Sequence, residues 1–400
     1  MIERLPKLGI LTSHAIQYHV PVYREITNQQ LIELDVFFMT DAGLNPTYDP
    51  GFRQVIKFDV DLISGYSSRI LKNRSPFSRG SGPFRILNTE LLSPRFYREV
   101  DALLINGWGN ASLIVAILGC QLTRTPYFVL GDSILQTKCS RKVHRFKLLI
   151  KRAVVGTIVR RASMCLAIGT ENSEFYVAYG AKGSQICFVP LTVDNEAFRR
   201  AGEAARSQRA EYLQSLQLNP ALPTVLFTGK LQTWKRPQDV IEAAKLMKVE
   251  ANIVLIGDGP MMTELRELSE GMDNVRLLGF VNQAAIGGWY GVADLFVLPS
   301  KIDHWGLAVN EAMAAGSVPV VSDAVGCGRD LVQPDTGFKF SVGDFKQLAD
   351  VLDVALSDAT HLDTLRANGS ALIDRYSPQV AATNIAMVVR DLGRKCVSES

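Results

Sequence analysis

The 400-residue chain contains no continuous apolar run of about 18 residues, the length that a helix needs to cross a lipid bilayer. Its opening, MIERLPKLGILTSHAIQ, also lacks the apolar stretch typical of a secretory leader, and residues 8–11 read instead as a short core strand. We therefore expect a cytoplasmic protein. Any contact with a membrane is then peripheral, on its inner face.

The sequence also has few cysteines and no large excess of basic over acidic residues. The six cysteines are scattered, and none of their spacings matches a zinc or redox motif, so we expect reduced thiols and no metal site. Basic and acidic residues number 43 and 40, and the net charge of +3 gives no indication of nucleic-acid binding. The chain has neither the phosphate loop of nucleotide hydrolases nor a G-x-G-x-x-G after its first strand, where TSHAIQYHVP stands. These absences argue against nucleotide hydrolysis and against a nicotinamide enzyme.

What the sequence does contain is a regular alternation of short apolar runs and longer amphipathic segments. This alternation predicts parallel, doubly wound sheets of the α/β class. In the first half of the chain the expected strands are 8–12, 34–40, 102–106, 127–131, 164–169 and 186–189. In the second half they are 224–228, 253–256, 275–278, 295–299 and 318–322, with helices at 238–248, 259–269 and 345–356.

The boundary between two domains is expected near residues 190–206, where one series of strands ends and a charged helix, 196–217, begins. Residues 58–87 are rich in Ser, Gly, Arg and Pro, so we expect a surface loop there. The predicted domains are 1–195 and 196–376, followed by a C-terminal helical segment, 377–400.

The most informative stretch is LPSKIDHWGLAVNEAMAAGSVPVVS, residues 298–322, which reads as strand end, loop, helix, turn and strand. Asp303 lies in the loop, Gly306 at the helix entry and Glu311 about one turn inside. The unpaired N–H groups of Gly306 and Leu307 and the positive end of the helix dipole suit a phosphate. The two acids can accept hydrogen bonds from sugar hydroxyls. An ordinary helix with a polar cap is the alternative interpretation.

Two cations flank a glycine turn earlier in the second half. Gly229 and Lys230 follow the strand 224–228, and Lys235 opens the next helix. Cations five residues apart around such a turn can neutralise a diphosphate and the charge that develops on a departing nucleotide. The alternative is that both are solvated surface lysines.

Two further loops follow strands in the second half. Gly257, Asp258 and Gly259 come directly after the strand 253–256, where glycines let the backbone approach a ligand closely. This pattern alone is weak, because many strand-to-helix connections resemble it. Phe280 and Val281 follow the next strand, and Phe280 is either a contact for a flat ligand or an ordinary core residue.

In this order, the elements resemble the signatures of the family-four retaining glycosyltransferases, which have the GT-B fold. Their usual form is E-G-F-G-L-x-x-x-E-A-M-A-x-G-x-P-V-V, where this chain has D-H-W-G-L-A-V-N-E-A-M-A-A-G-S-V-P-V-V. Asp303 therefore replaces Glu, one extra residue precedes Pro319, and Lys230 stands where Arg is usual. The resemblance implies two Rossmann-like domains facing across a cleft, with the C-terminal helix 377–400 crossing back to the first domain. It also implies a metal-independent transfer that retains anomeric configuration, with lysines and helix amides in place of a metal.

The resemblance assigns the donor, a UDP- or GDP-sugar, to the second domain. Glu311 would hold the ribose hydroxyls, Asp303 the transferred sugar, and the loop of Phe280 and Val281 the base. The other expected donor contacts are Gly229, Lys230, Lys235, Gly257, Asp258, Gly259, His304, Trp305, Gly306 and Leu307. The expected catalytic set is Asp132, Lys230, Lys235, Asp303 and Glu311.

The first domain is expected to bind the acceptor, at the carboxyl edge of its sheet. His14 and Gln17 directly follow the first strand, although either histidine of that loop could equally be a packing or capping residue. Many family members carry a His-Asp pair after the fourth strand, and here Asp132 stands there without the His. Asp132 is therefore either a polar group near the acceptor hydroxyl or a helix cap. Glu171 is the last expected acceptor contact.

Residues 138–161 carry nine Lys and Arg and no acid, interleaved with apolar residues. Such a stretch predicts contact with an anionic membrane surface or, alternatively, a buried helix with a basic rim. The resemblance points to enzymes of bacterial surface polysaccharide synthesis, and thus to a saccharide or a lipid-linked saccharide as acceptor. Two other hypotheses remain open, a catalytically silent sugar-nucleotide-binding subunit and a sugar-nucleotide epimerase with the same fold.

Overall fold

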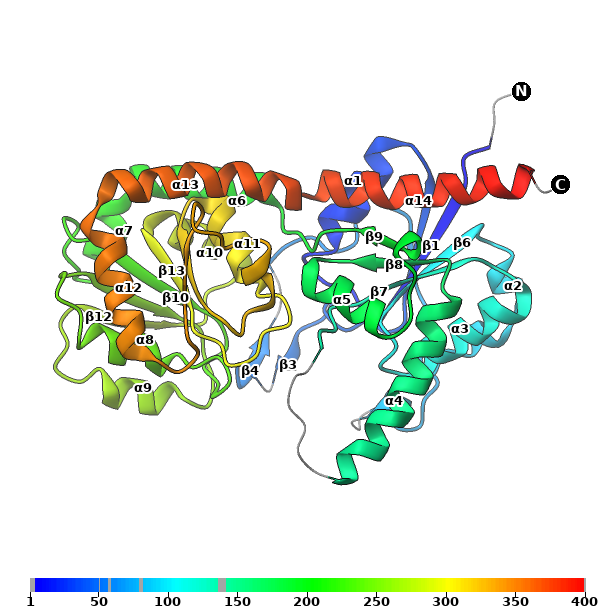
Figure 1. Cartoon of the computed structure of the whole chain (residues 1–400), viewed down its shortest axis with the longest axis horizontal. Helices are drawn as coiled ribbons and strands as arrows, with labels where there is room; N and C mark the ends of the chain where they lie inside the picture. Colours follow the sequence, from blue (N-terminus) through cyan, green and yellow to red (C-terminus); the bar gives the residue numbers. More distant parts are fainter. Residues whose placement is uncertain (1–3, 50, 57–58, 79–81, 136–141, 399–400) are drawn as a thin grey trace. The chain divides into compact units, whose positions relative to one another are not determined.

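The computed structural model describes the chain except for residues 1–3, 50, 57–58, 79–81, 136–141 and 399–400. Its contacts divide into two compact units, each built around its own sheet (Figure 1). The first unit comprises Met1–Asn45, Asp61–Leu191 and Pro378–Ser400. The second comprises Pro46–Val60 and Thr192–Ser377.

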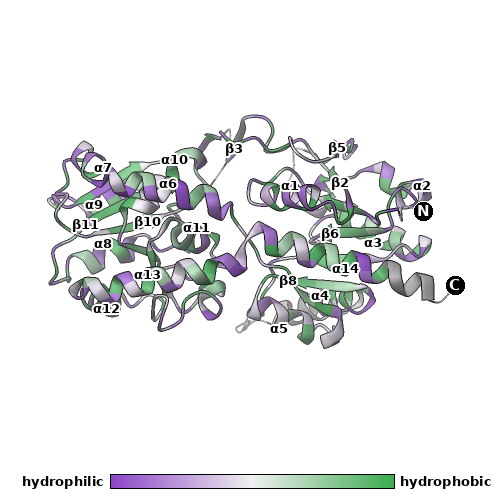
Figure 2. Ribbon diagram, turned by 90° about the horizontal axis from the view of Figure 1, so that it is seen from above, coloured by the Kyte–Doolittle hydropathy of each residue, from purple (hydrophilic) through white to green (hydrophobic). Residues whose placement is uncertain are grey.

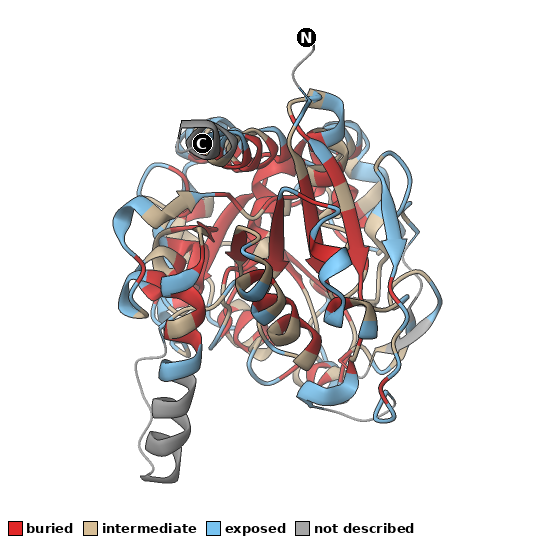
Figure 3. Ribbon diagram, turned by 90° about the vertical axis from the view of Figure 1, so that its right-hand side faces the viewer, coloured by how far each residue is buried: buried red, intermediate tan, exposed pale blue. Residues whose placement is uncertain are grey.

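The first unit has a seven-stranded parallel sheet in the order β5-β2-β1-β6-β7-β8-β9. The central strands are almost completely buried, which is what continuous apolar runs such as ALLIN and YFVL require of a parallel sheet (Figure 3). The strands are β1 Lys7–Thr12, β2 Glu33–Phe38, β5 Ser68–Ile70, β6 Ala102–Asn106, β7 Tyr127–Leu130, β8 Met164–Ala167 and β9 Ile186–Phe188.

Helices pack on both faces of this sheet. The last helix, α14, lies along α1, and the Gln29 side-chain amide donates to the Thr383 hydroxyl at 3.1 Å. A second bond runs from the Asn384 amide to the carbonyl of Phe188 at 2.9 Å, so α14 belongs to the first unit although it ends the chain. The α-helices are α1 Val20–Gln29, α2 Pro94–Tyr97, α3 Ala111–Thr123, α4 Lys142–Arg161, α5 Thr170–Ala178 and α14 Pro378–Ser398.

The second unit has a six-stranded parallel sheet in the order β12-β11-β10-β13-β14-β15. The strands are β10 Thr224–Thr228, β11 Asn252–Ile256, β12 Val275–Gly279, β13 Leu295–Leu298, β14 Val318–Ser322 and β15 Phe338–Phe340. Figure 2 colours the central strand β10 mostly as hydrophobic, in keeping with its sequence TVLFT. The helices are α6 Asn195–Ser207, α7 Arg209–Ser215, α8 Gln238–Ala244, α9 Met262–Leu268, α10 Gln283–Val292, α11 Leu307–Ala315, α12 Phe345–Ser357 and α13 Ala359–Ile373.

The fold class predicted from the sequence is confirmed, since both units are Rossmann-like parallel-sheet domains. Every expected strand is present within two residues of its expected bounds, and those at 102–106, 224–228 and 318–322 have identical bounds. The expected helix 196–217 is divided at Gln208 into α6 and α7. Among the described residues, no helix combines the length and apolar character that spanning a membrane requires.

One segment lies in a different unit from the one expected. Residues 46–60, assigned above to the first domain, contain the antiparallel pair β3 Thr47–Asp49 and β4 Gln54–Ile56 and belong to the second unit. The physical reason is a set of contacts with that unit, including an ion pair between Asp49 and Lys230. The expected loop 58–87 also contains a short strand, β5.

Candidate functional site

The strand order of the second unit indicates where in the sheet a ligand would bind. Its chain runs outward from β10 to β11 and β12, and then returns to the other side of β10 with β13. In open α/β sheets, ligands bind at the carboxyl ends of the strands where the order reverses in this way. The loops that follow β10 and β13 flank this point, and they carry Lys230, Lys235 and Asp303.

Three glycines hold the loops after β10, β11 and β12 together. Gly229, Gly257 and Gly259 have φ angles of +147°, +144° and +155°, a region that side chains disfavour. The Gly229 N–H donates to the Ile256 carbonyl at 2.9 Å, and the Gly257 N–H donates to the Gly279 carbonyl at 2.8 Å. A Cβ on Gly257 would lie 1.8 Å from the Gly229 carbonyl oxygen. A Cβ on Gly259 would likewise lie 2.6 Å from the Leu231 carbonyl oxygen, so Gly257 and Gly259 have a packing role.

We expect Gly257→Ala to lower the free energy of unfolding by more than about 3 kcal/mol, because backbone overlap adds to the strain of the positive φ. The matched control is Gly271→Ala, where φ is +78° and no atom lies within 4 Å of a Cβ. That change adds strain without overlap and should cost about 1 kcal/mol. Urea denaturation followed by circular dichroism measures both, and equal losses would contradict the packing role.

The place at the carboxyl ends of β10 and β13, where the strand order reverses, is called the switch point below. Lys235 and Asp303 form a short ion pair there. The Lys235 Nζ lies 2.6 Å from the Asp303 Oδ2, and the two side chains are 24% and 15% exposed. The backbone of Asp303 is fixed in turn, because its carbonyl accepts the Gly326 N–H at 2.9 Å. The structure thus brings the two predicted residues together with their charges balanced, at a partly buried position.

Helix α11 begins directly beside this pair. Gly306, its N-cap, has a φ of +94°, and a Cβ there would lie 2.7 Å from Val325 and 3.0 Å from Leu298. Only glycine therefore allows the chain to turn into the helix at this place. The first N–H groups of the helix, on Leu307 and Ala308, have no partner within the helix and point from its positive end, as a phosphate site requires.

Glu311 accepts hydrogen bonds from two residues of α10. The Tyr290 hydroxyl donates to its Oε2 at 2.8 Å, and the Gln283 amide donates to its Oε1 at 3.3 Å. The Thr228 hydroxyl lies 2.5 Å from the Tyr290 hydroxyl, which extends this chain to the end of β10. Burial raises the pKa of Glu311, although the bonds from Tyr290 and Gln283 oppose the shift. Its carboxylate is thus held in place but poorly solvated.

The remaining predicted donor residues have varied surroundings. Trp305 is only 4% exposed, and its indole N–H donates to the Asn310 Oδ1 at 2.8 Å, so its side chain supports the loop from within. The Asp258 carboxylate accepts the N–H of Gly259 at 2.7 Å. Phe280, Val281 and His304 remain partly exposed at the same edge of the sheet.

In the first unit, the loop after β1 presents neutral histidines. His14 Nδ1 lies 2.8 Å from the Ser13 hydroxyl. Burial and the charge of Arg85 lower the pKa of His14. Burial also lowers the pKa of His19 to about 4, with His14 adding to the effect and Asp132 opposing it. Both imidazoles are therefore hydrogen-bonding groups rather than cations at neutral pH.

Asp132 is exposed in the loop after β7, and no helix begins in the described residues 131–135 that it could cap. Glu171 lies in the first turn of α5, which begins after β8. Asn172, the residue after Glu171, is buried and connects the two loops. Its amide donates to the Ser133 carbonyl at 2.7 Å, and its Oδ1 accepts the Ile168 N–H at 3.1 Å. Asn172 thus fixes the Asp132 loop to the end of β8.

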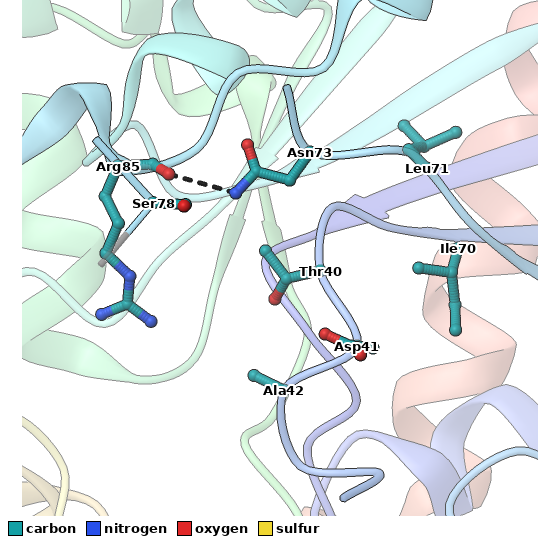
Figure 4. A pocket seen from close by; sticks show the side chains of 8 residues that line it. All are labelled: Thr40, Asp41, Ala42, Ile70, Leu71, Asn73, Ser78 and Arg85. Atoms are coloured by element: carbon teal, nitrogen blue, oxygen red, sulfur yellow. Dashed lines mark hydrogen bonds between the residues drawn. The ribbon is translucent and has the colours of Figure 1, made fainter. Parts of the chain in front are cut away.

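A cavity of about 520 Å³ opens beside the ends of β2 and β5 in the first unit (Figure 4). Its lining is mixed, with polar Thr40, Asp41, Asn73 and Arg85 beside apolar Ile70 and Leu71. The Asn73 amide donates to the Arg85 carbonyl at 3.1 Å. None of the acceptor residues predicted from the sequence lines it. Its size and its mixture of charged and amide groups suit a hydroxyl-rich ligand.

The basic run 138–161 is only partly covered by the structure. Residues 138–141 and the side chains of 142–151 lie outside the described part, so the contact surface expected there is not shown. In the last turns of α4, Val155, Ile158 and Val159 are buried in the core, whereas Arg152, Arg160 and Arg161 are exposed. Within the described residues, no group of three or more His, Cys, Asp or Glu side chains is placed to hold a metal ion.

Sequence reasoning missed Tyr290, Gln283 and Asp49, which contact predicted site residues. Tyr290 and Gln283 lie in an apolar helix with no pattern that marks them as ligands of Glu311. Asp49 precedes Lys230 by 181 positions. No local signal connects partners at such separations, and only the three-dimensional arrangement reveals them.

Part of the chain is similar to known protein sequences. Residues 208–371 match the model described as glycosyl transferases group 1. A D-inositol 3-phosphate glycosyltransferase from Xylanimonas cellulosilytica is 30% identical over 234 residues, which are 56% of each chain. The sulfoquinovosyl transferase of Arabidopsis thaliana is 27% identical over 60% of this chain and 48% of its own. The chain thus spans about half the length of these relatives.

A longer match extends into the first unit. The N,N'-diacetylbacillosaminyl-diphospho-undecaprenol alpha-1,3-N-acetylgalactosaminyltransferase of Campylobacter jejuni is 24% identical over 76% of this chain and 82% of its own. Among solved structures, the HepE protein of Anabaena in complex with UDP has a TM-score of 0.73 at 16% identity, covering 97% of this chain and 100% of that one. This structural likeness confirms the two-domain fold.

Proposed function

We propose that this chain, a member of the group 1 glycosyltransferases with a GT-B fold, moves a sugar from a nucleoside diphosphate sugar to an acceptor hydroxyl with retention of configuration. In this reaction the bond between the anomeric carbon and the β-phosphate oxygen breaks, and a bond to the acceptor oxygen forms. The acceptor proton passes to the departing diphosphate. The main chemical requirement is therefore to stabilise negative charge on the leaving group.

The observation that carries this proposal is the meeting of Lys235, Asp303 and the start of α11 at the switch point of the second sheet. Lys235 and the amides of Leu307 and Ala308 supply positive charge without a metal ion, and Lys230 adds a second cation. Preorganised donors of this kind stabilise developing charge because they need not reorient during the reaction. Asp303 orients Lys235 and is left to accept hydrogen bonds from the transferred sugar.

The Glu311 carboxylate is proposed to hold the ribose. Two bonds, from Tyr290 and Gln283, fix its position, and each carboxylate oxygen has further acceptor capacity. A ribose presents two neighbouring hydroxyls, which match the two oxygens of one carboxylate. Phe280 and Val281, at the end of β12, then lie on the side where the base is expected.

The acceptor is proposed to bind the first unit. The neutral His14 and the exposed Asp132 offer hydrogen bonds beside the ends of β1 and β7, and the cavity of Figure 4 offers a further polar surface. We propose a lipid-linked saccharide because the name of the Campylobacter relative specifies a sugar on diphospho-undecaprenol. Gln17 and Glu171 complete the proposed acceptor contacts.

A thermal-shift screen of the full chain against UDP, GDP and their sugars tests the donor assignment. A ligand that binds only the native state at about a hundred times its Kd stabilises by about 2.7 kcal/mol, so a bound nucleotide should raise Tm by several degrees. The same nucleotide should leave the Tm of Lys235→Ala nearly unchanged. If no nucleotide shifts the Tm of the parent chain at millimolar concentration, the donor proposal fails.

A peripheral membrane contact through residues 138–161 is also proposed, on the basis of their charge and apolar content. Replacing Arg141, Lys142, Arg145 and Lys147 by Gln should reduce flotation with anionic vesicles and leave hydrolysis of a soluble donor unchanged. Binding of the parent should also weaken with salt, since the Debye length falls to about 3 Å at 1 M.

The matched control for this prediction removes four exposed cations from the second unit, by substituting Gln for Lys248, Arg266, Lys339 and Lys346. This control changes the net charge equally and should keep vesicle binding. If flotation changes neither with salt nor with the first four substitutions, the proposed electrostatic membrane contact is wrong. The interpretation of residues 138–161 as a buried helix with a basic rim then remains.

A binding subunit without turnover is a second candidate, because each predicted donor cation is already paired with a carboxylate in the structure. Such a protein would bind nucleotide sugars and never cleave them. An epimerase is the third, and it would convert one nucleotide sugar into another without an acceptor. Product analysis after incubation with donor alone distinguishes these outcomes from slow hydrolysis by a transferase.

A further inference from the structure

The hairpin segment 46–60 covers predicted nucleotide contacts of the second unit. Its strands β3 and β4 pair with each other, and its contacts place it in that unit although it lies between two stretches of the first unit in sequence. It meets the loops after β10 and β12 and the start of α10, and each contact involves a charged or aromatic side chain.

The first contact is an ion pair between Asp49 and Lys230. The Asp49 carboxylate oxygens lie 3.1 and 2.9 Å from the Lys230 Nζ, with side-chain exposures of 31% and 37%. The N–H groups of Gly51 and Phe52 donate to the Asp49 Oδ1 at 2.7 and 3.2 Å. The carboxylate is thus fixed by its own hairpin and presented to Lys230 as an anion.

The second contact is aromatic. The Phe52 and Phe280 ring centroids are 5.1 Å apart with the planes at 74°, an edge-to-face arrangement. The Lys230 Nζ also lies 4.9 Å from the Phe52 ring centroid. Phe52 therefore covers the residue proposed to meet the base, as well as the cation proposed to meet the diphosphate.

The third contact is at α10. The Asp59 carboxylate accepts the Ala284 N–H at 3.2 Å, in the first turn of that helix, where an anion is favoured by the dipole. Gln283, the preceding residue, donates to Glu311. The far end of the hairpin segment is thus attached to the helix that positions the proposed ribose ligand.

We propose that the hairpin segment 46–60 occupies the nucleotide site of the unliganded protein. The Asp49 carboxylate then pairs with Lys230 in the place that a phosphate of the donor would take. The inference rests on the proposed function. A nucleoside diphosphate carries more negative charge and more acceptor oxygens than a carboxylate, so it displaces Asp49 and takes Lys230. The segment is then an intrinsic competitor that lowers the apparent affinity for the donor.

The pair is about one-third exposed, and pairs of this kind contribute up to about 1 kcal/mol. Releasing Lys230 from Asp49 should therefore tighten diphosphate binding about fivefold, which corresponds to about 1 kcal/mol. This is small enough for the donor to overcome at ordinary concentrations. It is also large enough to measure by calorimetry.

The test is titration of UDP, GDP and inorganic pyrophosphate into the full chain and into Asp49→Asn, which keeps the shape of the side chain and removes its charge. We expect a Kd about five times lower in the variant for every probe that the parent binds. Glu242→Gln is the matched control, because it removes one acid of the same unit from a partner, Lys245, outside the proposed site and should leave Kd unchanged.

Asp59→Asn, at the other end of the segment, checks the inference independently and should lower Kd in the same direction by a smaller factor. An unchanged or higher Kd in Asp49→Asn overturns the inference, and the higher value would make Asp49 a supporting residue of the site. If neither the parent nor Asp49→Asn binds any of the three probes, the proposed function itself fails. Binding by the variant alone would support both.

Discussion

Lys235→Ala is expected to lower kcat/KM for the nucleotide sugar about a hundredfold, the effect typical of removing one preorganised donor from a developing negative charge. Two consequences combine in this variant. The diphosphate loses a cation, and the Asp303 carboxylate, 15% exposed, loses the partner that lies 2.6 Å away. An unpaired carboxylate beside the diphosphate repels it, so the loss exceeds that of a single surface charge. Initial rates of nucleoside diphosphate release measure the effect.

Lys245→Ala is the control, since Lys245 pairs with Glu242 at 3.6 Å and lies outside the proposed site. It should keep the rate of the parent. Lys230→Ala should weaken nucleotide binding by a smaller factor than Lys235→Ala, because Lys230 is more exposed and already shares its charge with Asp49. If both site variants bind UDP and GDP as the parent does, the diphosphate assignment is wrong.

Glu311→Ala is expected to abolish measurable turnover through loss of donor binding, while Glu311→Gln separates function from stability. Burial raises the pKa of Glu311 in the folded protein. A carboxylate with a raised folded-state pKa lowers stability as pH rises above its unfolded-state value, because the folded state holds the proton more tightly. The penalty is complete above the folded-state pKa and absent well below the ordinary value of 4.5.

Glu311→Gln removes that penalty and still offers an oxygen to the Tyr290 hydroxyl. The unliganded variant should therefore melt at or above the temperature of the parent at pH 7, with the difference disappearing near pH 4. Its kcat/KM should nevertheless fall about a hundredfold, because a neutral amide accepts ribose hydrogen bonds more weakly than a carboxylate. Calorimetric melting at both pH values and initial rates test the two parts. A variant that is less stable at pH 7 with unchanged turnover would make Glu311 structural.

The fold was predictable wherever strands are long and buried on both faces. The runs at 102–106, 224–228 and 318–322 are apolar, bounded by turn residues and recovered with identical limits. The strands missed, β3, β4, β5 and β15, have three residues each, too few to show a period. The division of 196–217 at Gln208 was missed because both resulting helices continue the same charged pattern.

The site was predictable to the extent that its residues lie close together in sequence. Lys235 and Asp303 were each proposed from a separate motif, but their pairing was not predicted, because 68 positions separate them in the sequence. The neighbours of Glu311 were not predictable, because hydrogen bonds from Tyr290 and Gln283 depend on how α10 packs on α11. Trp305 was expected to contact the donor because it lies between Asp303 and Gly306 in the sequence. Its position in the sequence does not reveal that its side chain is buried.

The most direct test of the central proposal is incubation of the full chain with a panel of UDP- and GDP-sugars, followed by analysis of the products. Without an acceptor, we expect slow release of a nucleoside diphosphate from one member of the panel, and with a saccharide acceptor a faster transfer. The anomeric configuration of the product should match that of the donor. The release should be lost in Glu311→Ala. A parent chain that binds a nucleotide sugar and never cleaves it, or that inverts the anomeric configuration, would contradict the proposed reaction.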